Sequence, residues 1–367
     1  MKRTTACLIV HPRSGRNLAR VPEVVAVLAA AGWITDVVVK ESKGQTLELA
    51  ARAAEAGYDF VIAYGGDGTM NHVVNGVLAF AGRRETVVGV IPGGTANVWA
   101  SEVGIATDPV RAARMLVGSD IRSVDVGHVG VESLTLGDES SALDRETVRG
   151  VGARRHFLLM AGLGVDAALM GGTPTGLKHK LGVGAVALTA LRLLPSLRTY
   201  PVTIRSGETD VPVWEGRALQ LVVGNTRLYG GVTHLTPEAL LNSGELDLAV
   251  ITAASRVSAL GQVLALLLRG RPAHAQAVAS RGPRFRVNAP ASVGLQLDGS
   301  AVSLGKYLTA PARHAFERAA DHAGVSVDFV FDAVPAALRI AIPSDYDGAL
   351  FRGVGGGGSP ADARRGT

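Results

Sequence analysis

The sequence holds one cysteine, Cys7, among its 367 residues. A single cysteine excludes an internal disulfide and a structural zinc site built from thiolates, and it fits a reducing compartment. No uninterrupted apolar run approaches the ~20 residues that a membrane-spanning helix requires, and residues 1–3 lead directly into a strand-like segment. We therefore expect neither a signal peptide nor a membrane anchor, and we expect a cytoplasmic location.

Neither charge sign is in large excess, because 37 Lys and Arg residues stand against 32 Asp and Glu residues. The net charge of +5 would help the chain approach phosphates or an anionic membrane. It is well short of the charge typical of nucleic-acid-binding proteins, so nucleic acid is not expected as a partner.

Apolar residues and glycine are abundant. The chain is 47% hydrophobic, which is enough for large cores, and its length predicts about two domains. Glycine contributes 46 residues, well above the usual ~7% share, and the excess lies in short strings between apolar runs. These strings are the first place to look for a functional site.

The first third of the chain alternates between strand-like and helical patterns. Continuous apolar strands of this kind are typical of a parallel sheet covered by helices on both faces. We expect an α/β domain over residues 1–125, with strands at 6–10, 34–39, 60–64 and 87–91 and helices at 21–31, 47–56, 71–80 and 109–117.

The next region, residues 126–335, has strands separated by turns more often than by helices, which predicts a mainly antiparallel β-sandwich. Its expected strands are 157–160, 201–204, 218–223, 246–251, 284–287 and 294–297. Two segments read as insertions, 132–149 and 301–335, and the second is expected to hold a helix at 310–323 and a strand at 325–331.

Four further segments complete this prediction. Apolar helices at 182–194 and 257–268 are followed by arginines, which allows membrane-surface contact, although a core position is the more frequent outcome. Residues 336–352, with a strand at 338–342, form a closing segment that should return to the first domain. Residues 353–367 are expected to be a disordered tail.

A glycine-rich string lies between the third predicted strand and its helix, at residues 65–69, which read Gly-Gly-Asp-Gly-Thr. Successive glycines allow a tight turn that brings backbone N–H groups against an anion, so this string predicts a phosphate-binding loop. Asp67 would repel phosphate by itself. It fits such a loop if it binds Mg²⁺ or orients an acceptor hydroxyl, and the alternative is that it caps the helix.

Two more loops follow neighbouring strands, at residues 91–97 and 11–16. The carboxyl ends of parallel strands meet at one edge of a sheet, so the three loops should converge there. Together they predict a nucleotide-binding site, whereas any one of them alone would be weak evidence.

The sequences of two of these loops are specific enough to indicate a family. Residues 65–69 together with 92–97 (Pro-Gly-Gly-Thr-Ala-Asn) resemble the catalytic domain of the diacylglycerol kinase and sphingosine kinase family, especially its soluble bacterial lipid kinases. The resemblance continues in order along the chain, at residues 11–15, 224–225, 229–231, 237–247 and 297–299.

This resemblance implies a phosphofructokinase- or NAD kinase-like α/β domain, a β-sandwich domain, and an ATP and Mg²⁺ site in the cleft between them. In relatives a threonine before the second helix also contacts the nucleotide, and Lys40 stands at the matching position. The implied nucleotide contacts are Ser14, Gly15, Lys40, Gly65, Gly66, Asp67, Gly68, Thr69, Met70, Asn71, Gly94 and Thr95.

The sequence departs from the family at the expected catalytic base. Relatives read Asp-Gly-Glu, and the glutamate is thought to take the proton from the lipid hydroxyl, whereas this chain reads Asp-Gly-Ser at 298–300. Three explanations stay open for an active enzyme. Asp298 serves as the base near Ser300, a later carboxylate does so, or the reaction needs little base assistance. The later candidates are Glu317, Asp321 and Asp328.

A second departure concerns a regulatory magnesium site that some bacterial relatives have. The match places this site at Leu240, Ser243 and Glu245, with a serine where the relatives have an aspartate. Serine is a poor ligand for a dication that prefers carboxylate and water. Glu245 or Asp247 could compensate, and the alternative is an ordinary solvated turn.

The expected function is that of a lipid kinase which transfers the γ-phosphoryl group of ATP, with Mg²⁺, to the hydroxyl of a diacylglycerol-like or sphingoid lipid. The enzyme would bind the membrane surface peripherally and reversibly. A homodimer is a further expectation. Two alternatives are an NAD kinase-like enzyme and a catalytically inactive protein that binds nucleotide or lipid.

Overall fold

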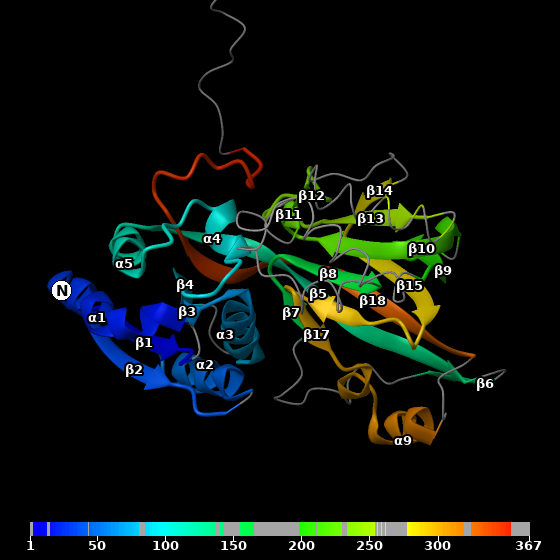
Figure 1. Ribbon diagram of the computed structural model, residues 1–367, viewed down its shortest axis with the longest axis horizontal. Coiled ribbons are helices and arrows are strands. Elements are labelled where there is room, and N and C mark those ends of the chain that lie inside the picture. The colour runs from blue at the N-terminus through cyan, green and yellow to red at the C-terminus, as the bar shows by residue number, and fades with distance from the viewer. Residues whose placement is uncertain are drawn as a thin grey trace, which may run out of the picture.

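The computed structural model of the protein describes residues 3–12, 15–42, 44–80, 85–136, 139–142, 155–164, 198–209, 211–229, 233–253, 255, 258, 261, 277–318 and 324–353 (Figure 1). Several predicted features lie outside the described residues. They are Ser14, Asp321, the helix at 182–194, the helix at 257–268 apart from Ser258 and Gly261, half of the insertion at 132–149, and the tail beyond residue 353.

Four parallel strands form the first part of the sheet, in the order β4-β3-β1-β2. We call these strands and helices α1–α5 the parallel region. Its elements are β1 (Thr5–Val10), η1 (Gly15–Arg20), α1 (Val21–Ala30), β2 (Ile34–Val39), α2 (Gln45–Glu55), β3 (Phe60–Gly65), α3 (Asp67–Ala79), β4 (Val87–Pro92), α4 (Val98–Glu102) and α5 (Pro109–Val117).

Burial explains the arrangement of the parallel region. Every residue of β3 and β4 is buried, since α1 and α5 pack together on one side of the sheet and α2 and α3 on the other (Figure 1). Strand β2 is the edge strand, and its residues are exposed or half-buried. The predicted α/β fold with a parallel sheet is therefore confirmed, and the loops after β1, β2, β3 and β4 all leave from one edge of the sheet.

The rest of the chain is mainly antiparallel. We call strands β6–β17 and the adjoining parts of β5 and β18 the antiparallel region; its core is a second cluster of buried apolar side chains. Its elements are β5 (Asp120–Leu136), β6 (Glu139–Ala142), β7 (His156–Phe157), β8 (Met160–Gly164), β9 (Tyr200–Ser206), β10 (Pro212–Gly224), β11 (Leu228–Tyr229), β12 (Thr233–His234), β13 (Leu246–Thr252), β14 (Ala277–Gly282), β15 (Arg284–Pro290), β16 (Leu295–Leu297), β17 (Ser300–Val302), η3 (Leu304–Lys306), α9 (Ala310–Arg318) and β18 (Val325–Ile342).

Two long strands join the regions. β5 and β18 pair with each other in antiparallel fashion along most of their length, and β18 also pairs with β15 at one end and in parallel with β4 at the other. The sequence predicted separate strands at 325–331 and 338–342, but they are one strand. Its register shifts between Val334 and Leu338, where Ala336 has a left-handed backbone (φ 48°). A bulge of this kind bends a strand without ending it.

The segment after β17 holds η3 and α9, so the helix predicted at 310–323 is present over Ala310–Arg318. Figure 1 shows α9 beside the antiparallel region, away from the parallel strands. No helix among the described residues is both long and apolar enough to cross a membrane.

Candidate active site

The Gly-Gly-Asp-Gly-Thr string forms a tighter turn than its sequence predicted. β3 ends at Gly65 and α3 begins at Asp67, so a single residue separates strand from helix and the predicted start at residue 71 is wrong. Gly65 lacks a Cβ for a packing reason, because a Cβ there would lie 2.4 Å from Oγ1 of Thr69. The turn can therefore close only with glycine at this position.

A second contact joins this turn to the loop after β4. A Cβ on Gly94 would lie 2.5 Å from the Cα of Gly66, so the two backbones touch where both residues are glycine. The Asn97 side chain holds the second loop by accepting from Gly94 N and donating to Gly94 O, both at 2.9 Å. Gly94 and Thr95 are exposed. The result is a backbone-lined surface at the sheet edge, which a side chain at either glycine would fill.

Asp67 connects the two loops through its carboxylate. It accepts hydrogen bonds from the backbone N–H groups of Val98 at 3.0 Å and Trp99 at 3.1 Å, which open helix α4. Burial raises the pKa of the Asp67 carboxyl, and these two hydrogen bonds oppose the rise. Asp67 is thus a cap, but of α4 and not of its own helix.

Two of the other predicted nucleotide contacts stand at the same sheet edge. Lys40 follows β2, and its N–H donates to the carbonyl of Val10 at the end of β1, at 3.1 Å. Gly15 opens η1, shortly after β1. The parallel sheet therefore brings Lys40 beside the end of β1, as the predicted convergence of the loops requires.

Met70 and Asn71 lie in the first turns of α3, and both are buried. The Met70 side chain belongs to the apolar core of the parallel region. The Asn71 amide crosses to the antiparallel region, where Nδ2 donates to Asp298 Oδ2 at 2.8 Å and to the carbonyl of His156 at 2.9 Å. The side chains of these two residues serve packing and the contact between regions.

Asn75, one turn further along α3, was not identified from the sequence. Its Oδ1 accepts from the N–H groups of Arg155 at 2.8 Å and His156 at 2.9 Å, and its Nδ2 donates to the His156 carbonyl at 2.9 Å. The signal was present as two asparagines four residues apart, which share one face of a helix. Asn71 and Asn75 together attach α3 to the start of β7.

Asp298 is buried at the turn between β16 and β17. Oδ1 accepts from Leu159 N at 2.9 Å and Met160 N at 3.0 Å, while Oδ2 accepts from Leu158 N at 3.0 Å as well as from Asn71. Burial raises the pKa of the Asp298 carboxyl, and the four donated hydrogen bonds oppose that rise. Each oxygen therefore already holds two donors.

Ser300 lies against the first turn of α3, since a Cβ on Gly68 would be 3.3 Å from Ser300 Oγ. The position at which relatives have a glutamate therefore faces the glycine turn. The later carboxylates are placed differently. Asp328 lies within β18, where Oδ1 accepts from Asn288 Nδ2 at 2.7 Å, and Glu317 is exposed on α9.

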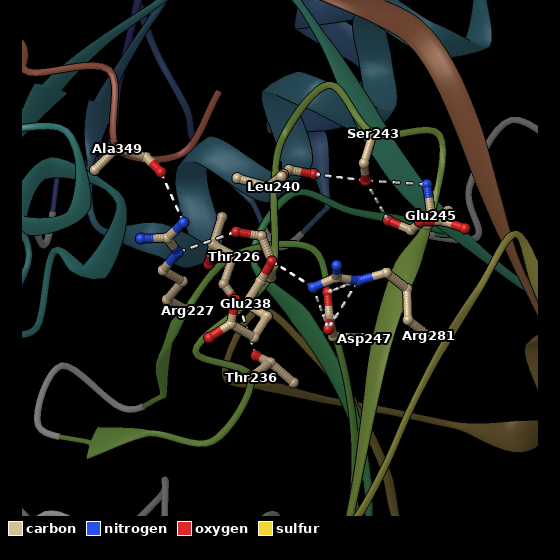
Figure 2. A network of polar contacts seen from close by, with 11 residues as sticks. Thr226, Arg227, Thr236, Glu238, Leu240, Ser243, Glu245, Asp247, Arg281 and Ala349 are labelled. Carbon is tan, nitrogen blue, oxygen red and sulfur yellow. Dashed lines mark hydrogen bonds and ion pairs between the residues drawn. The ribbon is translucent and has the colours of Figure 1, made fainter. Parts of the chain in front are cut away.

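Leu240, Ser243 and Glu245 come together in one turn, as the family pattern implied (Figure 2). Ser243 Oγ lies 3.2 Å from the carbonyl oxygens of both Leu240 and Glu245. No group of three or more His, Cys, Asp or Glu side chains suited to a metal ion occurs among the described residues. The centre of the turn offers one neutral hydroxyl and two carbonyls, whereas Mg²⁺ prefers carboxylate and water.

Comparison with known proteins agrees with this arrangement. The family model for the diacylglycerol kinase catalytic domain matches residues 5–129, and the model for the YegS C-terminal NAD kinase beta sandwich-like domain matches residues 161–341. The diacylglycerol kinase of Bacillus subtilis strain 168 is 32% identical over 303 residues, which cover 82% of this chain and 90% of the relative. The diacylglycerol kinase of Staphylococcus haemolyticus is 27% identical over 300 residues, which cover 81% of this chain and 82% of the relative.

A solved structure of a diacylglycerol kinase from Bacillus anthracis strain Sterne superposes with a TM-score of 0.64 at 18% identity. The alignment covers 94% of this chain and 99% of that one, so the two share a fold. The predicted combination of a parallel α/β region with a β-sandwich is therefore confirmed. With the motif turn, the second glycine loop and these relatives taken together, the chain belongs to the bacterial diacylglycerol kinase family and is a lipid kinase.

Proposed function

We propose that the protein transfers the γ-phosphoryl group of ATP to the hydroxyl of a diacylglycerol-like or sphingoid lipid. One observation carries the proposal. The glycine turn before α3 touches the loop after β4 at Gly94 and the acceptor-side strand at Ser300. A phosphoryl donor held by the two loops would therefore lie next to the position at which the family places its acceptor chemistry.

The nucleotide side of this site is built from backbone. Two loops at one sheet edge give small, exposed positions at Gly94 and Thr95, where a triphosphate can approach closely. Asp67 holds the loops together and is also the carboxylate suited to Mg²⁺, because each carboxylate oxygen has a lone pair beyond the one used by α4. Bound with ATP, Mg²⁺ would neutralise charge on the phosphates.

On the acceptor side we assign Asp298 a positioning role. Its four hydrogen bonds hold residues 158–160 and Asn71, and so set how β16 and β17 face α3. A carboxylate that already accepts four donors is a weak candidate for the base. Of the three explanations above, this supports a reaction that relies on positioning and charge neutralisation, with little base assistance.

The acceptor lipid implies a peripheral encounter with a membrane. The net charge of +5 favours an anionic surface, and the proposed product lipid is itself anionic. Such binding would be reversible, because surface charge of this size contributes only a modest attraction.

The decisive experiment offers purified protein ATP, Mg²⁺ and mixed micelles containing diacylglycerol, a sphingoid base or no lipid, with NAD in a parallel reaction. Wild type should phosphorylate a lipid, and Asp67→Ala should reduce the product to near background. Phosphorylation of NAD alone would favour the NAD kinase alternative. ATP binding by calorimetry without any phosphorylated product would favour an inactive binding protein and contradict the proposal.

A further inference from the structure

The turn at residues 240–245 is closed by a side chain at its centre. Ser243 Oγ lies 3.2 Å from the carbonyl oxygen of Leu240, 3.2 Å from that of Glu245 and 3.2 Å from the backbone nitrogen of Glu245 (Figure 2). The hydroxyl thus accepts from one N–H and can donate its hydrogen to either carbonyl. The two carbonyl oxygens thus share one hydroxyl, which donates to one of them at a time.

A magnesium ion would need a different geometry. Mg²⁺ binds oxygen at about 2.0–2.1 Å and keeps near-octahedral coordination. Here the hydroxyl oxygen already occupies the position between the two carbonyls, each 3.2 Å away. A cation could enter between the carbonyls only if the Ser243 hydroxyl moved aside. Even then the hydroxyl could offer the cation only a neutral ligand, where a carboxylate would offer a charged one.

A cationic side chain already stands in the same network. Arg281 Nη2 donates to Asp247 Oδ1 at 2.9 Å and to the carbonyl of Glu238, and Arg281 Nε contacts Asp247 Oδ1 at 3.2 Å (Figure 2). The hydrogen bond with Asp247 raises the pKa of the Arg281 guanidinium, and the nearby charges of Glu245 and Glu238 raise it further. Asp247, one of the two carboxylates that could have compensated for the missing aspartate, is therefore paired with arginine.

From these contacts we infer that Ser243 and Arg281 hold this turn without a divalent cation, so that the protein has no magnesium site there. The hydroxyl supplies the hydrogen bonds at the centre of the turn. The guanidinium bonds the Glu238 carbonyl and the Asp247 carboxylate, which flank the turn on either side.

The turn matters because it lies where the two regions join. Asp125 on β5 accepts from Gly244 N at 2.6 Å and from Ala336 N, at the β18 bulge, at 2.8 Å, and its own N–H donates to Leu241 O at 2.6 Å. One buried carboxylate thus ties the turn to both long strands that cross between the regions. Hydrogen bonds within the chain therefore tie the turn to the two strands that join the parallel and antiparallel regions.

The test uses the full-length protein without nucleotide or lipid, so its outcome is independent of the proposed kinase reaction. Magnesium chloride is titrated into wild type, Ser243→Asp, Ser243→Asp/Arg281→Gln and Asn242→Asp by calorimetry. Asn242 is an exposed residue of the same turn, so Asn242→Asp adds an equal charge outside its centre. We expect saturable binding in the low-millimolar range only where residue 243 is replaced by aspartate, and tighter binding in the double variant.

Thermal unfolding with magnesium or with EDTA gives a second readout and checks that the variants fold. The Tm of wild type should be the same in both, whereas magnesium should raise that of Ser243→Asp by about 2–4 °C. Ser243→Ala should have a lower Tm that magnesium does not restore. Saturable binding by wild type that Ser243→Ala abolishes would overturn the inference, and so would a lack of binding by both aspartate variants.

Discussion

The two regions of the molecule keep the family pattern to different degrees. In the parallel region the Gly-Gly-Asp-Gly-Thr motif keeps its charged residue, Asp67, which holds two glycine loops together. The antiparallel region has serine at both positions where the family resemblance implies an acid, and each serine has a definite neighbour. Ser300 lies against Gly68, and Ser243 bonds the carbonyls of its turn. The parallel region thus keeps the carboxylate of its motif, whereas the antiparallel region has small neutral side chains at both of its positions.

Removal of Asp67 should have the largest effect. Asp67→Ala takes away both acceptors for the first amides of α4, so we expect kcat/KM for ATP to fall about 10³-fold. The kcat/KM of Asp67→Asn, which keeps one acceptor, should fall less. Steady-state kinetics measure both, with exposed Asp120→Ala as a control expected near the wild-type rate. A wild-type rate for Asp67→Ala would show that activity does not depend on the Asp67 carboxylate, and the contrast between the two regions would then have no functional meaning.

Gly94→Ala tests the contact between the two loops. The added Cβ would lie 2.5 Å from the Cα of Gly66, and backbone has to move to relieve this. A displacement of about 1 Å at a reacting group can cost about 10²-fold, so we expect a loss of that size in kcat/KM. Gly118→Ala is the matched control, because its Cβ would meet nothing closer than 4.0 Å. Equal activities in the two variants would show that the loop contact is dispensable.

His156 lies where α3 meets the antiparallel region. It makes the stability of this contact between the two regions depend on pH. Burial, together with the nearby charges of His128 and Arg155, lowers the pKa of His156 to about 3. The folded protein therefore keeps this ring neutral, while the unfolded chain takes up a proton below about pH 6.5. Stability is thus fully present above that pH and is lost as the pH falls toward 3.

Urea unfolding at pH 6.5 and pH 5 measures this loss. Wild type should lose about 1.7 kcal/mol more than His156→Gln across that interval, since the slope for one group rises from half to nearly all of its greatest value of about 1.4 kcal/mol per pH unit. His314→Gln, at an exposed site on α9, controls for removal of one histidine from the unfolded chain. Equal losses of unfolding free energy in wild type and His156→Gln would contradict a neutral His156 ring in the folded protein.

Ser300 should show the smallest effect. If the reaction needs little base assistance, Ser300→Ala should stay within about threefold of the wild-type kcat. Ser300→Glu, which restores the family residue, should raise kcat about 10-fold and add an acidic limb to the pH–rate profile. Ser303→Glu adds the same charge at an exposed site and should change neither. Inactivity of Ser300→Ala would mean that the hydroxyl itself takes part.

Much of the fold could be predicted because its signals are local. Continuous apolar runs marked β3 and β4, and the glycine strings marked the turns that follow them. The division of β18 into two strands was wrong, because Pro335 and its small neighbours look like a break in the sequence. Pairing with β5 on both sides of the bulge carries the strand through.

The roles of the two buried aspartates could not be predicted. Asp298 is joined to Asn71 across 227 positions of the chain and to the 158–160 segment across about 140, and no local pattern records such partners. Asp67 was expected to face a ligand or cap its own helix, yet its partners begin the next helix, 31 residues away.

The sequence by itself determined the family, the parallel strands and the position of the glycine turns, because each depends on residues close together in the chain. Only the tertiary structure decided what the departures from the family mean. Whether a serine leaves a gap or fills one depends on which backbone groups surround it. Those groups come from segments that meet only when β5 and β18 bring the two regions together.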